Sequence, residues 1–415
     1  MIVPLAARAI AAVIGGILVI TAARSVLTTI IVPRPTGSWL IRSVDKATVA
    51  VYELVVKHVG DFRTRDRVLA TQAAVILILQ LITWLAIFFV GFSLLLWPFI
   101  DGGITEAFNT AGPALWFIGD SHVSGAWERT IQDCAAVAGL VTITLQIAYL
   151  PTLYSAFNRR ETDIALLNAR AGVPSWGPEL LARTHYALGS GSSTIDTLPD
   201  LYGQWERFAA DITESHTTYL PLVRFRSPRP LSSWLTALLA VLDSAALIMA
   251  LSPSAAPEVP ARLCLRSGFI CLTEIARAMG IKVPEEPDPD AGISLSYEDF
   301  EDAVARMRKV DFPIERSTKE AWPEFVGWRV NYEQAAYALA YAIDAVPALW
   351  SGPRRWPFTP ISPIRPSAGK PPKEHPAKKR HSPGRQGSGA RRASTAAARR
   401  PAADGRGDGA STPSS

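Results

Sequence analysis

A run of uncharged residues from Val68 to Phe99 constrains this chain more than any other feature of its sequence. The run is 32 residues long, and Gln72 and Gln80 are its only strongly polar side chains. A straight helix needs about 20 apolar residues to cross the hydrocarbon core of a bilayer. The run therefore predicts a membrane span that tilts or projects beyond the bilayer.

Two other apolar stretches, at about 6–32 and 134–157, also predict membrane spans. No cluster of charges precedes the first stretch, and no small-residue cleavage site separates it from a soluble segment. We therefore interpret it as an uncleaved span rather than a signal peptide. The third stretch has Gln146 near its middle, and Pro151 is expected to kink its inner end.

Basic residues are distributed unevenly between the connections. Residues 33–67 contain seven Lys and Arg, whereas residues 100–128 contain none and carry four acids. Cytoplasmic connections of membrane proteins are enriched in Lys and Arg. We therefore predict a multi-pass protein of the plasma (inner) membrane, in contact with lipid. The N-terminus and the 100–128 loop are expected outside, and the 33–67 connection and everything beyond residue 158 in the cytoplasm.

A fourth apolar stretch, 231–251, is nearly long enough to span a membrane. Asp243 near its middle would cost at least about 2.5 kcal/mol at the centre of a bilayer. A fourth span would also place the C-terminal tail outside, and the next stretch, 261–281, is interrupted by charges that make a return span unfavourable. We predict that 231–251 is instead the buried helix of a soluble domain.

The remainder of the chain has a helical pattern. Periodic apolar stretches, separated by short Pro/Gly/Ser connectors, lie near 161–172, 178–188, 194–218, 261–280, 297–310 and 331–349. Strand-like alternation with turn dipeptides is absent, so the predicted fold class is all-α. From about Gly352 onward Pro, Ser, Gly, Ala and Arg dominate, and such a tail cannot bury enough apolar surface to fold.

Charge and motifs exclude several function classes. The formal net charge is +5, but the residues from Arg365 onward carry +9, so the basic character belongs to the tail and does not indicate a nucleic-acid-binding domain. The chain contains no P-loop, no GxSxG, no kinase-type glycine loop and no HExxH pair. We therefore expect no enzyme, no cofactor and no metal site.

The segment between the second and third predicted spans carries the main functional indication. Residues 107–119 (AFNTAGPALWFIG) are moderately apolar and about long enough for three helical turns. Two spans that bracket a short re-entrant helix and a Gly-containing extended segment form the layout of a tetrameric cation-channel pore. Non-helical backbone occurs at membrane depth only where it lines a water-filled path or is buried in protein. Alternatively, residues 107–119 belong to an ordinary external loop that contains a short interfacial helix.

From about Ala107 to Pro174 the sequence resembles the bacterial two-transmembrane potassium-channel (ion-channel-2 type) family. There, a pore segment of the kind SGVTLTTLGYGD precedes a Gly-bearing inner helix that can end in a YxxxxRRE-like run. The matching letters here are AGPALWFIGDSH and then AAVAGLVTITLQIAYLPTLYSAFNRRE, the second half being the stronger. The resemblance implies a homotetramer with a central path for a monovalent cation.

The positions that the resemblance aligns with the family's TLGYGD filter depart from its pattern. They are Phe117, Ile118, Gly119, Asp120, Ser121 and His122. In the family, backbone carbonyls and one Thr hydroxyl replace the ion's water shell, and glycines let the backbone aim those carbonyls inward. Here Phe117 removes the hydroxyl, Asp120 replaces the bracing aromatic and Ser121 replaces the second glycine. A ring of four Asp120 side chains suits a less selective cation path. A sealed, non-conducting bundle is the alternative.

Two residues of the third predicted span have open interpretations. Gly139 either allows close helix approach or a bend, or is one of many small residues in a packed membrane helix. Gln146 either faces a central cavity or hydrogen-bonds to a neighbouring helix.

Together these features predict four parts and leave two hypotheses of function. The parts are a first transmembrane helix with a basic cytoplasmic loop (1–67), a channel-like pore module (68–160), a helical cytoplasmic domain (161–351) and a disordered basic tail (352–415). The chain is either a homotetrameric cation pore with an altered filter or a non-conducting, membrane-anchored protein on the same scaffold. In the second case the helical domain and tail would bind partners or anionic lipid.

Overall fold

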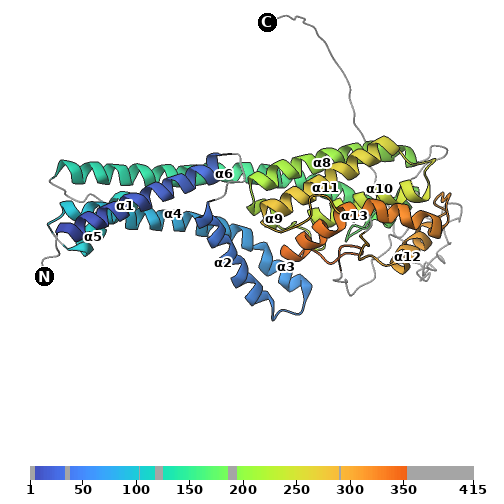
Figure 1. The fold of residues 1–415 in the computed structure, drawn as a ribbon, viewed down its shortest axis with the longest axis horizontal. Helices are drawn as coiled ribbons and strands as arrows, with labels where there is room; N and C mark the ends of the chain where they lie inside the picture. Colours follow the sequence, from blue (N-terminus) through green and yellow to red (C-terminus); the bar gives the residue numbers. More distant parts are fainter. Residues whose placement is uncertain are drawn as a thin grey trace, which may run out of the picture. The chain divides into compact units, whose positions relative to one another are not determined.

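The computed structural model describes residues 5–32, 38–101, 103–116, 125–185, 194–288 and 291–352. Regular elements in these ranges are all helices, and the ranges contain no strand, which confirms the all-α prediction (Figure 1). The chain divides into two units, and the described residues all belong to the first, Met1–Pro363.

Among the described residues, four helices are long and apolar enough to cross a membrane, which indicates a membrane protein. They are α1 (Leu5–Val26) with its π-helical continuation η1 (Leu27–Ile31), α4 (Gln72–Leu96) between α3 (Phe62–Ala70) and the 3-10 turn η2 (Trp97–Phe99), α6 (Ala126–Ala171), and α10 (Trp234–Leu251). The first three coincide with the predicted spans and are largely exposed in the single chain, whereas every residue of α10 is buried.

Helices α1 and α4 pack against each other in opposite directions through small residues. A Cβ atom on Gly15 would lie 2.5 Å from the carbonyl oxygen of Gly91, so the two backbones touch at this crossing. Further along, Trp84 Nε1 donates a hydrogen bond to Ser25 Oγ at 2.9 Å. Close approach of backbones at glycine is typical of helix pairs in membranes, where packing rather than hydrophobic burial drives association.

The outward faces of α1, α4 and α6 carry large apolar side chains that no described residue of the chain covers. They include Ile10, Val13, Ile17, Ile20, Ile78, Ile82, Val137, Leu140 and Ile147. A contiguous apolar surface of this kind is unfavourable in water and suits lipid or another protein surface.

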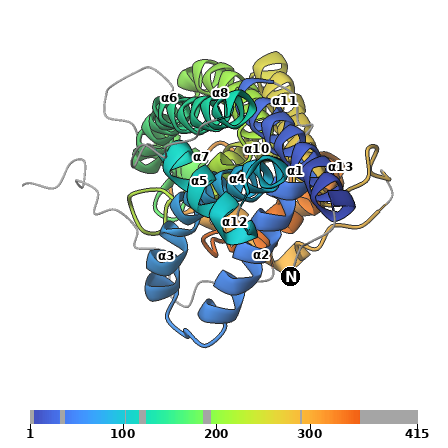
Figure 2. The same ribbon diagram turned by 90° about the vertical axis from the view of Figure 1, so that its left-hand side faces the viewer.

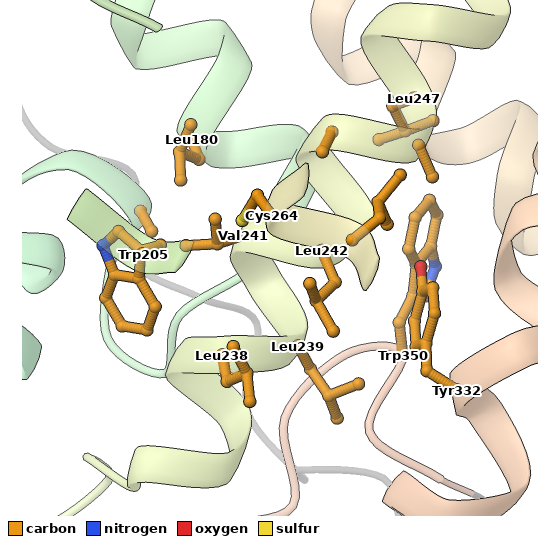
Figure 3. Packing of buried hydrophobic residues seen from close by; sticks show 14 of the residues in the cluster. Leu180, Trp205, Leu238, Leu239, Val241, Leu242, Leu247, Cys264, Tyr332 and Trp350 are labelled. Carbon is orange, nitrogen blue, oxygen red and sulfur yellow. The ribbon is translucent and has the colours of Figure 1, made fainter. Parts of the chain in front are cut away.

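The helices that follow α6 in the sequence build a separate hydrophobic core around α10. These helices are α7 (Gly177–His185), η3 (Thr194–Thr197), α8 (Leu198–Thr218), α9 (Pro221–Arg224), α11 (Glu258–Ala278), α12 (Tyr297–Arg308) and α13 (Thr318–Ala342). Figure 3 shows α10 side chains such as Leu238 and Leu242 between Trp205 of α8 on one side and Tyr332 and Trp350 on the other. All of these side chains belong to one buried cluster, so α10 forms the centre of this domain.

Helix α6 connects the two cores without a break. It is 46 residues long, continues through Pro151 and ends at Ala171. The next residue, Gly172, has φ +84° and confirms the predicted helix end, since this conformation favours glycine. The predicted boundary at 160–161 therefore falls inside a continuous helix.

Asp243, the charge in the middle of α10, is paired inside the core. Its Oδ1 accepts hydrogen bonds from Arg329 Nη1 and from the Tyr332 hydroxyl, the latter at 2.7 Å. Arg329 also donates to Glu333 Oε2 and to the carbonyl oxygen of Trp350, both at 2.6 Å. Asp243 is 1% exposed and Arg329 is fully buried. Because each charge has several partners, the buried-helix prediction for 231–251 is confirmed without an unpaired charge in the core.

Two boundary predictions need correction. The interpretation of 33–67 as a loop is wrong for most of its length, because the segment forms α2 (Trp39–Val56) and the first part of α3. Its charges suggested a loop, but those of α2 lie on one side of an amphipathic helix. The helix predicted near 331–349 is α13, which begins at Thr318 behind a capping box formed by Ser317 and Glu320.

Replacing Arg329 with Met should destabilise the helical domain, because Asp243 then stays buried without its cationic partner. We expect a loss of about 3–5 kcal/mol in the free energy of unfolding, seen as a lower melting temperature of the full chain in detergent. Arg262→Met is the matched control, since it removes an exposed pair with Glu258, and it should cost at most about 1 kcal/mol. Equal melting temperatures for the two variants would contradict the structural role of the buried pair.

Candidate functional site

The short helix α5 (Ile104–Trp116) lies against both α4 and α6, the helices that flank it in the sequence (Figure 2). Phe108 of α5 meets Phe89 of α4 edge-on, with 5.2 Å between the ring centroids. Gln132 Nε2 of α6 donates a hydrogen bond to the carbonyl oxygen of Thr110 at 3.2 Å. The predicted short apolar helix is therefore a packed element of the bundle.

The C-terminal end of α5 meets α6 at Gly139. A Cβ atom on Gly139 would lie 2.5 Å from the carbonyl oxygen of Leu115, a distance that no side chain tolerates without movement of the backbone. Gly139 thus allows a close helix approach, one of its two interpretations. It lies thirteen residues after Ala126, the first residue of α6. At a rise of about 1.5 Å per residue, Leu115 contacts α6 about 20 Å from its beginning.

The six positions aligned with the filter, 117–122, lie outside the described residues. The structure describes the chain up to Trp116 and again from Gly125, whose backbone N–H donates to Glu128 Oε2 at 3.0 Å. The two ends of the described chain lie at different positions along α6. The chain leaves α5 next to Gly139 and resumes at the beginning of α6.

Gln146 lies on the same side of α6 as Gly139, because residues seven apart share a helix face. Its side chain is 5% exposed, and its Oε1 atom has no hydrogen-bond partner within the described part of the chain. The side chain is therefore turned into the bundle of its own chain. A buried amide oxygen without a partner is unfavourable, and such an atom is available to water or to a cation.

A polar junction lies where α2, α4 and α9 meet. Gln80 Nε2 of α4 donates to Asp45 Oδ1 of α2 at 3.2 Å, and the charge of Arg224 from α9 acts on the same carboxylate. A cavity of about 780 Å³ adjoins this contact. Its charged lining comes from α2, α8, α9 and α11 and comprises Arg42, Asp45, Lys46, Glu53, Glu214, Arg224, Glu274 and Arg277.

The sequence did not predict this junction. Its only local signal was Gln80, a polar residue in an otherwise apolar run. Burial raises the pKa of Asp45 from 3.8 to about 6, and the hydrogen bond from Gln80 and the charge of Arg224 oppose that rise. The carboxyl of Asp45 is therefore protonated more readily than that of an ordinary aspartate.

Arg160, the second arginine of the Arg-Arg-Glu run, ties α6 to the helical domain. Its guanidinium is buried and donates to the carbonyl oxygens of Leu222 and Phe225 at 2.9 and 2.7 Å. It also lies 3.0 Å from His216 Nε2. Burial and the neighbouring Arg160 charge hold the pKa of His216 well below its ordinary value, so the neutral ring can accept a hydrogen bond from Arg160. Arg160 therefore fixes α6 to α8 and α9 at this point.

No protein-family model, no curated protein and no solved structure matches this chain. Within the ranges that the structure describes, no group of three or more His, Cys, Asp or Glu side chains is arranged to hold a metal ion. The candidate function therefore rests on the fold and on the contacts described above.

Replacing Gly139 with Ala should lower the free energy of unfolding by roughly 1–3 kcal/mol, because the added methyl group meets the carbonyl oxygen of Leu115. Gly16→Ala in α1 is the matched control, since its nearest neighbour would be a Leu95 methyl group at 3.9 Å. That control should be neutral or stabilising by up to about 1 kcal/mol. Thermal unfolding in detergent compares the two, and a Gly139→Ala protein as stable as the control would exclude a tight contact.

The raised pKa of Asp45 predicts a pH-dependent stability. Because the folded pKa of about 6 lies above the ordinary value of 3.8, ionised Asp45 disfavours the folded state. The free energy of unfolding is therefore highest below about pH 4 and falls by roughly 2–3 kcal/mol as the pH rises through about 6.

Asp45→Asn keeps a hydrogen-bond acceptor for Gln80 and removes this loss. Its melting temperature should equal that of the wild type at about pH 4 and exceed it at about pH 7. Glu53→Gln, on the same helix, serves as the control and should follow the wild type at both values. An Asp45→Asn protein less stable than the wild type at neutral pH would contradict the raised pKa.

Proposed function

We propose that this chain is a multi-pass inner-membrane protein that forms a cation pore. In the proposal, α1, α4 and α6 are the three spans and α5 is a re-entrant pore helix. Four copies surround a common axis, and residues 117–122 of each line a path of weak selectivity for monovalent cations. The N-terminus is outside, and the helical domain and tail are cytoplasmic.

The depth of α5 carries the proposal. Its last turn contacts Gly139, which lies five residues inside the predicted span 134–157, about 8 Å below the outer end of that span. A helix resting on the membrane surface would contact only the outermost turns of α6. A helix that ends at membrane depth without crossing is tolerated where the following backbone lines a water-filled path or is covered by protein.

The orientation of α5 favours cations. The helix runs in the same direction as α6, from Thr110 beside Gln132 to Leu115 beside Gly139. Its C-terminal end, which carries a partial negative charge and unsatisfied carbonyl groups, is therefore the deeper end. No basic residue in its last turn neutralises that end. Helix C-termini at membrane depth coordinate cations in this way.

The chemistry of 117–122 supports weak selectivity rather than potassium selectivity. Phe117 offers no hydroxyl ligand, and Ser121 stands where a second glycine would allow an inward carbonyl. Four Asp120 carboxylates around an axis would concentrate cations of several kinds.

Two ion pairs support the proposed sidedness. Arg65 binds Asp344 at 2.8 Å, and Arg226 binds Asp66 at 2.7 Å. Both join the Lys- and Arg-rich 33–67 connection to the helical domain, so these two regions belong on one side of the membrane. The enrichment of Lys and Arg in cytoplasmic connections makes that side the cytoplasm.

Ion flux through liposomes containing the purified full-length protein tests the proposal. We expect flux of K⁺ and Na⁺ alike, reduced roughly tenfold by Asp120→Asn because the acidic ring is lost. Ser121→Gly should change the ratio of K⁺ to Na⁺ flux. Asp101→Asn is the matched control, because it removes the same charge from the same connection outside 117–122 and should leave the flux near that of the wild type.

Each other outcome identifies a part of the proposal that fails. No flux from folded, tetrameric protein would contradict conduction and favour the non-conducting, membrane-anchored alternative. Flux that neither Asp120→Asn nor Ser121→Gly alters would contradict a path through 117–122. A monomeric particle would contradict the shared axis.

A further inference from the structure

Helix α2 presents three different faces. Ile41, Thr48 and Val56 are its buried residues, on the side where α2 packs against α4. A second face is polar and lines the 780 Å³ cavity opposite α8, α9 and α11; it carries Arg42, Asp45, Lys46 and Glu53. These four polar residues occupy an arc of about 100° on a helix of 3.6 residues per turn.

The third face of α2 is uncovered and mainly apolar, with Ser43 as a polar member. Trp39, Val51, Leu54 and Val55 are 65, 59, 65 and 52% exposed. They occupy an arc of about 160°, roughly opposite the polar face. No part of the described chain covers this surface. An amphipathic helix in water would bury its apolar face against its own domain.

We propose that the apolar face of α2 is embedded in the headgroup region of the cytoplasmic leaflet, so that α2 is an interfacial helix between the bilayer and the helical domain. The proposal goes beyond the pore. It requires only that α1 and α4 cross the membrane.

The position of α2 between two candidate spans supports lipid as the occupant. The first candidate span ends at Ile31, and α2 begins at Trp39. After α2, helix α3 leads to the second predicted span, whose uncharged run begins at Val68. Helix α2 is therefore connected to a candidate span on each side, and both connections lie on the cytoplasmic side of the predicted topology.

The polarity of the faces gives the orientation of α2. Its charged side faces the cavity and the helical domain, which the ion pairs place on the same side of the bundle as the 33–67 connection. The apolar side points away from that domain, where the lipid lies.

Fluorescence quenching of the full-length protein in vesicles tests this placement. In a Cys134→Ser background, single cysteines introduced as Leu54→Cys or Lys46→Cys carry an environment-sensitive fluorophore; Cys264 and Cys271 are fully buried. The vesicles contain phosphatidylcholine and phosphatidylglycerol, with a nitroxide-labelled lipid or with aqueous iodide as quencher. Lys46→Cys is the matched control on the polar face of the same helix.

For a face buried about 5–10 Å into the leaflet, the lipid nitroxide should quench the probe at position 54 at least about threefold more than the probe at position 46. Iodide should show the opposite preference. Equal iodide quenching at both positions would mean that the apolar face is open to water. Protection of position 54 from both quenchers would mean that a protein surface, such as a second copy, covers it. Either result would overturn the proposal.

Discussion

The contact between the Leu115 carbonyl and Gly139 determines how deeply α5 lies in the bundle, and the proposed pore depends on that depth. A bilayer core offers no water to backbone groups, so a chain that leaves a helix at membrane depth needs protein or trapped water around it. In the single chain, α1, α4 and α6 expose broad apolar faces. In the proposed tetramer, several copies around one axis would cover part of that surface and surround the segment that follows α5.

Similar apolar helices have different environments in this chain, and the charge of Asp243 favours the environment of α10. Helix α10 is apolar and long enough to cross a membrane, yet it is entirely buried within the helical domain. Asp243 would be unpaired in lipid, whereas in the domain it is bonded to Arg329 and Tyr332. The charge thus favours burial among partners over insertion in a bilayer, where its solvation would cost several kcal/mol.

The sequence predicted features that depend on neighbouring residues and missed those that depend on distant ones. The candidate spans, the short helix after α4, the helix end at Gly172 and the buried α10 all follow from local apolar runs, glycine and charge. Helix α2 was not predicted, because a stretch rich in charge between two spans is typical of a loop, although its charges have helical spacing. The start of α13 has a local signal, the capping box of Ser317 and Glu320, but Pro323 interrupts the helical pattern behind it. The junction of Asp45 with Arg224 had no local signal, since the two residues are far apart in the chain. The filter positions 117–122 lie outside the described residues.

Several contacts connect the membrane helices to the domain beyond them. Arg160 joins α6 to α8 and α9, and Asp45 of α2, bonded to Gln80 of α4, faces the charge of Arg224 from α9. These contacts could regulate a pore only if the bundle forms one, and the proposed pore depends on the depth of α5. Labelling from outside intact cells, with a membrane-impermeant thiol reagent in a Cys134→Ser background, measures that depth directly. A re-entrant α5 predicts rapid labelling of Glu106→Cys at its exposed beginning and strong protection of Trp116→Cys at its end. Equal labelling rates at the two positions would place α5 on the membrane surface and contradict the pore.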